Sequence, residues 1–146
     1  MRLDRILAAV ELPLAVAEPV IGCAADLARL TGAELVLLHV AAPDADVAGL
    51  EAGPPSVRDS RGHELRAEHQ ALLDRAEALR RSGLAAHAHL VPGVIADTIL
   101  AQAERHGAGI IVLGSHRHGA LYKAVLGTST DAILRRSSLP VVVVPG

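Results

Sequence analysis

One stretch of this 146-residue chain gathers most of the side chains that could hold a charged ligand. It runs from Gly114 to Ser129 and reads Gly-Ser-His-Arg-His-Gly-Ala-Leu-Tyr-Lys-Ala-Val-Leu-Gly-Thr-Ser. The apolar run Ile110 to Leu113 precedes it and is typical of a buried strand, while a helical segment ending at Arg135 and Arg136 follows. A strand, a loop and a helix start in this order favour an anion, because the first N–H groups of a helix are unpaired and lie at the positive end of its dipole.

The small residues of this stretch fit such a site. Gly127 is expected to open the helix, and Thr128, Ser129 and Thr130 place hydroxyls on its first turn. Gly114, at the end of the strand, has no Cβ and would let a ribose or a phosphate approach the backbone. The hydroxyls also have a simpler explanation, since Ser and Thr commonly cap helix starts. The residues alone leave both explanations open.

The rest of the chain alternates between strand-like and helical patterns. Continuous apolar runs predict buried strands, and apolar positions at helical spacing between them predict helices. Strictly alternating elements indicate one α/β domain, spanning 1–146, with a parallel sheet covered by helices on both faces. The predicted strands are Arg5–Val10, Glu34–Val40, Ala85–Val91, Ile110–Leu113 and Val141–Val144. The predicted helices start at Pro19 and end before Gly32, span Arg61–Ser82, lie between the turn at Pro92 and Gly93 and the stop at Gly107, and follow Gly127.

A parallel sheet of this kind binds ligands beyond the carboxyl ends of its strands, where the strand order reverses. The loops available there follow Val10, Val40 and Leu113. A further segment, Ala41 to Ser60, shows no periodicity and is interpreted as a long loop.

Composition excludes several classes of function. A net charge of −2 and a single aromatic residue, Tyr122, argue against a nucleic-acid surface. No apolar run is long enough to span a membrane, and the one cysteine, Cys23, suits a reducing compartment, so we expect a cytoplasmic protein. His87 and His89 alternate onto one side of a predicted strand; they could be metal ligands, but a half-exposed edge strand explains them more simply.

Familiar nucleotide signatures are incomplete in this sequence. Gly114 to Gly119 has the glycine spacing of a P-loop, but Ala120 and Leu121 stand where Lys and Ser or Thr belong. No Gly-x-Gly-x-x-Gly follows the first strand. Without that lysine, the motif lacks the cation that holds the phosphates during transfer, so fast phosphoryl transfer is not expected. A dedicated enzyme is therefore the less favoured interpretation.

The motifs resemble those of the universal stress protein family, along the whole chain. Members that bind ATP carry Gly-x2-Gly-x9-Gly-Ser/Thr after the fourth strand. Here Gly114, Gly127 and Thr128 match, and Arg117 replaces the second glycine. The resemblance extends to the Arg-Ile-Leu-Ala-Ala-Val start, the Leu-Val-Leu-Leu-His-Val second strand and the Leu-Pro-Val-Val-Val-Val-Pro end. It implies a three-layer α/β/α sandwich with strand order 3-2-1-4-5, similar to adenine nucleotide alpha-hydrolases.

The resemblance also implies roles for individual residues. Glu11, in place of the usual Asp, would contact the ribose side of the ligand, and the backbone of Val40 would meet adenine. Leu113 would line the base pocket and Gly114 would approach the ribose. The phosphates would be bound by Gly127, Thr128 and Ser129.

Two functions follow from this resemblance. The first is an ATP-binding regulatory protein, with or without Mg²⁺, in which Arg117 either donates to phosphate or obstructs it. Hydrolysis would be slow or absent. The second is an interaction module of the same fold that binds no nucleotide. In both cases a homodimer through the apolar strand Val141 to Val144 would cover an otherwise exposed sheet edge.

Overall fold

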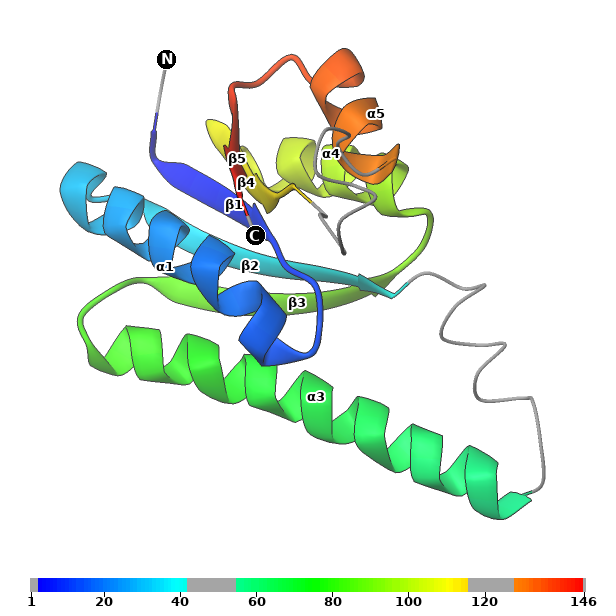
Figure 1. Ribbon diagram of the computed structural model, residues 1–146. Coiled ribbons are helices and arrows are strands. Elements are labelled where there is room, and N and C mark those ends of the chain that lie inside the picture. Colours follow the sequence, from blue (N-terminus) through cyan, green and yellow to red (C-terminus); the bar gives the residue numbers. More distant parts are fainter. Residues whose placement is uncertain (1–2, 42–54, 116–127, 146) are drawn as a thin grey trace.

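The computed structural model describes residues 3–41, 55–115 and 128–145. They form one five-stranded sheet in which every neighbouring pair of strands is parallel, in the order β3-β2-β1-β4-β5 (Figure 1). The predicted fold class and strand order are therefore confirmed. The elements are β1 (Arg5–Ala9), α1 (Leu14–Thr31), β2 (Glu34–Ala41), α3 (Pro55–Arg81), β3 (Ala86–Pro92), α4 (Ile95–His106), β4 (Ile110–Gly114), α5 (Thr128–Arg136) and β5 (Val141–Val144).

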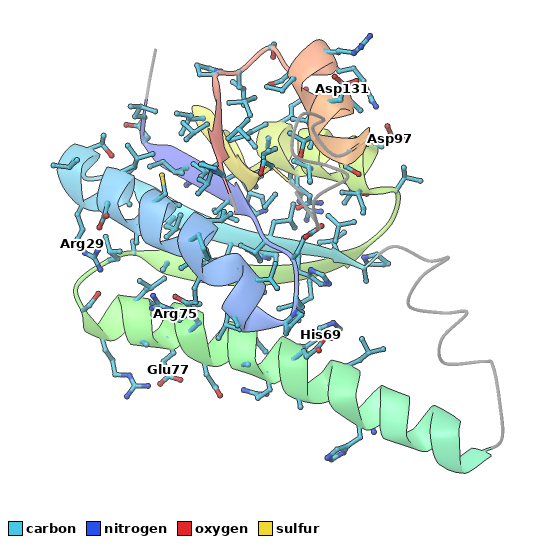
Figure 2. All side chains as sticks on the ribbon, in the orientation of Figure 1. Arg29, His69, Arg75, Glu77, Asp97 and Asp131 are labelled. Carbon is cyan, nitrogen blue, oxygen red and sulfur yellow. The ribbon has the colours of Figure 1, made fainter. Side chains whose placement is uncertain are left out.

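Helices cover both faces of the sheet, which makes three layers. Helices α1 and α3 lie on one face, and α4 and α5 lie on the other (Figure 1). Each face has its own core, built almost wholly from Ala, Val, Leu and Ile, since strand residues alternate between the two. An ion pair between Arg75 Nε and Glu18 Oε1, at 2.9 Å, joins α3 to α1 on the first face (Figure 2). None of the described helices combines the length and apolar character needed to cross a membrane.

The start of the first helix was predicted wrongly. Pro19 was expected to be its first residue, but α1 begins at Leu14 and Pro19 lies inside it. A proline there forgoes one backbone hydrogen bond to the preceding turn. Burial of the apolar face that includes Ala17, Val20 and Ile21 offsets this cost. Tertiary packing therefore overrides the local preference of proline for a helix start.

The predicted loop from 41 to 60 is also partly wrong. Residues 55–60 belong to α3, which begins at Pro55, a position that favours proline because its missing N–H would be unpaired anyway. Residues 42–54 lie outside the described residues. The core-facing positions predicted on this helix are confirmed for Leu72, Ala76 and Leu79, each at most 2% exposed.

The predicted helix ends are confirmed where glycine takes the left-handed conformation. Gly32 has φ 75° and donates its N–H to the Ala28 carbonyl, and Gly107 closes α4 with φ 66°. Residues with a Cβ rarely adopt this conformation, so glycine marks the end of each helix. These ends direct the chain back into β2 and β4.

Candidate functional site

The strand order reverses between β1 and β4, because the chain leaves β1 toward one edge of the sheet and returns at β4 toward the other. The carboxyl ends of these two strands form the crevice where parallel sheets bind ligands. Ala9 pairs with Leu38 of β2 and Ala8 with Val112 of β4. Continuing these registers brings Glu11 level with Val40 on one side and with Ser115 on the other. The structure therefore gathers the strand ends from which the three predicted loops start.

The end of β1 is held to β2 by a histidine. His39 Nδ1 lies 3.0 Å from the Val10 carbonyl oxygen, and the Val10 N–H donates to the Leu38 carbonyl at 2.8 Å. His39 also lies against His69 of α3, with ring centroids 5.8 Å apart (Figure 2). These contacts fix the strand end from which Glu11 follows. Sequence reasoning missed His39, although its position beside Val40 in the second strand was a usable signal.

The two predicted base-pocket residues are well buried. Val40 is 8% exposed and Leu113 is 2% exposed, and both pack in the core between the sheet and α4. Their side chains therefore pack in the core. Only their backbone groups, at the strand ends, are available to contact a ligand. Glu11 is half-buried at the start of the connection to α1.

Gly114 has no structural need to be glycine. Gly114 does not have a positive φ; the described glycines that do are Gly32, Gly83, Gly93 and Gly107. A Cβ built on it would lie 3.4 Å from Val20 Cγ2 and 3.9 Å from the Val144 carbonyl oxygen, which is about ordinary van der Waals contact. The fold would accept alanine here, so close approach by a ligand remains a reason for glycine.

The first turn of α5 is fastened to the end of β4. The Thr130 hydroxyl donates to the Gly114 carbonyl at 3.0 Å, and Thr130 is fully buried. Helix α5 begins at Thr128, so the predicted helix start after the loop is confirmed. Thr130 was expected to place a hydroxyl on the first turn of the helix, and the hydrogen bond of that hydroxyl joins the helix to the strand. Ser129, beside it, is half-buried.

Two predicted phosphate-binding residues, Arg117 and Gly127, lie outside the described residues, as do His116 and His118. The structure therefore brings together Glu11, Val40, Leu113, Gly114 and the start of α5, and does not describe the loop that completes the predicted motif. Ser115, within that motif, was missed by sequence reasoning because it stands at a position for which the motif specifies no residue type. Its place directly after Gly114 was the only available signal.

A cluster of ionisable groups lies near the amino ends of the strands, away from the candidate site. Glu34, at the start of β2, binds Arg5 Nε through Oε2 and His87 Nε2 through Oε1, both at 3.0 Å. The hydrogen bond from Arg5, with the charges of Arg5 and His87, lowers the pKa of Glu34 against the effect of burial. His89 stacks on His106 of α4, with ring centroids 4.7 Å apart.

This cluster includes two histidines of an edge strand, His87 and His89. Strand β3 ends the sheet, as predicted, and His87 is 51% exposed on it. Among the described residues, no group of three His, Cys, Asp or Glu side chains could hold a metal ion. A groove of about 520 Å³ lies near the same end of the molecule, between α4 and α5, and its lining includes Leu100, Glu104 and Ser138. It lies at the amino ends of the strands, away from the point where their order reverses.

The sequence model of the universal stress protein family matches residues 2–145. The chain belongs to this family. Curated proteins yielded no match to the sequence. A universal stress protein from Archaeoglobus fulgidus is 27% identical with a TM-score of 0.66, over 97% of this chain and 44% of that one. The chain thus spans less than half the length of that relative.

Two further solved structures of the family share the fold over nearly their full length. UspA from Lactobacillus plantarum is 21% identical with a TM-score of 0.72, over 99% of both chains. A universal stress protein from Archaeoglobus fulgidus in complex with dAMP is 21% identical with a TM-score of 0.65, also over 99% of both chains. The family and its fold are therefore established for this universal stress protein.

Proposed function

We propose that this universal stress protein is a cytoplasmic regulatory protein that binds an adenine nucleotide, ATP, in the crevice between the ends of β1 and β4. The observation that carries the proposal is the junction at which Thr130 fastens the first turn of α5 to Gly114. This contact brings the unpaired N–H groups of a helix start to the point where the strand order reverses, and both features favour a bound phosphate. The relative solved with dAMP supports an adenine nucleotide as the ligand.

The nucleotide would lie across the three strand ends. Adenine would meet the backbone of Val40, the ribose would lie between Glu11 and Gly114, and Leu113 would close the base pocket from the core side. The phosphates would extend to Gly127, Thr128 and Ser129. Arg117 would add charge-assisted hydrogen bonds to the phosphate oxygens in place of those lost with the second motif glycine.

Regulation suits this site better than turnover. The Gly-x4-Gly spacing lacks the lysine and hydroxyl of a P-loop, so hydrolysis of ATP would be slow or absent. Mg²⁺ would bind through the phosphates and not through a carboxylate pair of the protein. ATP would then act by binding alone: as its concentration rises, it would stabilise one conformation or one partner complex.

A homodimer through β5 belongs to the same proposal. Pro140 and Val144 direct their carbonyls to the N–H groups of Ile111 in β4 and of Ser115, the residue after β4, each at 3.0 Å. Because backbone groups alternate in direction along a strand, Val141 and Val143 direct theirs to the open edge of the sheet. All four valines of β5 are half-buried. A second β5 would pair these backbone groups and cover the apolar side chains.

Calorimetric titration of nucleotide-stripped protein with ATP and Mg²⁺ tests the nucleotide site, after mass spectrometry of any small molecule that co-purifies. We expect micromolar binding and a retained adenine nucleotide. Gly114→Ala is a suitable variant, because its methyl group fits the fold but narrows the approach to the backbone. It should keep the thermal unfolding midpoint within a few degrees and weaken ATP about tenfold or more.

The matched control is Gly22→Ala in α1, where nothing lies within 4 Å of the added Cβ. This variant should bind ATP as the wild type does. Absence of ATP binding and of any co-purified nucleotide would contradict the proposal. That result would favour the second function, a dimeric interaction module that acts through β5.

A further inference from the structure

Two polar residues are buried among the described residues, and both lie where β4 meets α5. They are Ser115, 1% exposed, and Thr130, 0% exposed. The Thr130 hydroxyl is paired with the Gly114 carbonyl, and the Ser115 backbone N–H with the Val144 carbonyl. Ser115 Oγ has no hydrogen-bond partner among the described residues. Because buried hydroxyls in folded proteins are nearly always paired, this atom indicates a partner that the described residues do not supply.

Strand alternation places this hydroxyl on a definite side of the sheet. A Cβ on Gly114 would face Val20 of α1, so residue 114 points to the face covered by α1. Ser115 continues the ladder through its bond to Val144, and its side chain therefore points to the face of α4 and α5. On that face, Thr130 holds the first turn of α5 against β4. The Ser115 hydroxyl therefore lies beside the start of α5.

The first residues of α5 have no intrahelical partner for their N–H groups. A hydroxyl donor beside these N–H groups forms a donor set that suits one oxygen-rich anion. Asp131, an acid in the same turn, is paired with Arg135 Nε at 2.9 Å, which offsets its charge. Among its described residues, the first turn of α5 therefore offers no free acceptor to the Ser115 hydroxyl.

We propose that Ser115 donates its hydroxyl hydrogen bond to a phosphate oxygen of the bound nucleotide and so selects ligands that carry phosphate. The proposal rests on the nucleotide function proposed above. It adds a residue that stands at an unspecified position of the glycine motif, and it assigns that residue to the phosphate and not to the nucleoside. A hydrogen bond to a charged oxygen in a buried site is stronger than one between neutral groups.

The test is Ser115→Ala, titrated calorimetrically with ATP and with adenosine, together with the unfolding temperature of the ligand-free protein. ATP should bind about tenfold more weakly than to the wild type, because one hydrogen bond to a charged group is lost. Adenosine affinity should be unchanged. The ligand-free variant should be at least as stable as the wild type, because an unpaired buried hydroxyl is removed.

Ser137→Ala is the matched control at the other end of α5. The Ser137 hydroxyl donates to the Leu139 carbonyl at 2.9 Å and accepts from the Leu139 N–H at 3.0 Å. This variant should unfold at a lower temperature and keep its affinity for ATP. If Ser115→Ala behaves in the same way, the Ser115 hydroxyl has a partner within the chain and the proposal is overturned.

Two other outcomes are informative. Equal ATP affinity in Ser115→Ala and wild type overturns the role of Ser115 while leaving the nucleotide function intact. A wild-type protein that binds neither ATP nor adenosine overturns the nucleotide function itself, and the role of Ser115 with it. The wild-type titration therefore separates the two failures.

Discussion

At the scale of single residues, His106 shows how the fold acts on an ionisable group. Its Nε2 atom is buried without a partner among the described residues, and its ring lies against His89. Burial, followed by the nearby charges of His89, Arg105 and Arg5, lowers its pKa, and Glu34 opposes this only weakly. The folded protein therefore favours neutral His106.

A lowered histidine pKa makes stability depend on pH in one direction. Below about pH 6.5 the unfolded chain protonates this histidine while the folded chain resists, so the free energy of unfolding decreases as the pH falls. We expect the unfolding temperature of His106→Gln to fall less than that of the wild type between pH 7.5 and pH 5.5. Thermal unfolding at a series of pH values measures this difference.

His63→Gln provides the control, because His63 is exposed on α3. Its profile should follow that of the wild type. The Arg5–Glu34 interaction does not affect these comparisons, because the Glu34 pKa is lowered and its contribution to stability is lost only below about pH 4.5, outside the range tested. Parallel profiles for wild type and His106→Gln would refute the assignment.

Residue types revealed the candidate site only in part. Glycines and hydroxyls at motif spacing identified Gly114 and the start of α5 from the sequence. Their hydrogen bonds were not predictable, because Thr130 could equally have faced a ligand, the solvent or the strand. Ser115 was missed for the same reason: burial without a partner is a property of the packed molecule and leaves no mark on the sequence.

At the scale of elements, strands were predicted more accurately than helix starts. All five strands were located within a residue or two at each end. Continuous apolar runs, which burial on both faces demands, located four of them, and the edge strand β3 was located although His87 and His89 interrupt its apolar residues. Helix starts failed at Pro19 and at Pro55. In both cases proline was treated as a local boundary signal or a loop residue, while packing of the apolar face decided where the helix began.

The open edge of β5 yields a prediction at this scale. Val143→Pro removes an N–H that faces the open edge and leaves the bonds to β4 in place. If two copies pair through β5, this variant should sediment as a monomer at concentrations where the wild type is a dimer. Sedimentation velocity measures the difference.

Val142→Pro is the paired control, because strand alternation directs its N–H toward β4. It should lower the unfolding temperature by breaking the ladder within one chain. A dimer that survives in Val143→Pro would place the contact between the copies elsewhere on the surface.

For the molecule as a whole, the sequence predicted the topology well because few arrangements satisfy its pattern. Alternating buried strands and helices require parallel strands with crossovers, and the switch between β1 and β4 then falls where the glycine motif begins. The sequence did not predict that ionisable groups would gather near the amino ends of the strands. That cluster joins Arg5, Glu34, His87, His89 and His106, which are brought together by the register of the sheet and by the packing of α4 on it.

The central claim is the location of the nucleotide, and an ATP titration followed by ¹⁵N-resolved NMR tests it most directly. We expect the largest amide shifts at the carboxyl ends of the strands and the start of α5, at Val10, Glu11, Val40, Gly114, Ser115, Ser129 and Thr130. Shifts confined to the groove lined by Leu100, Glu104 and Ser138, or no shifts at saturating ATP, would contradict the account.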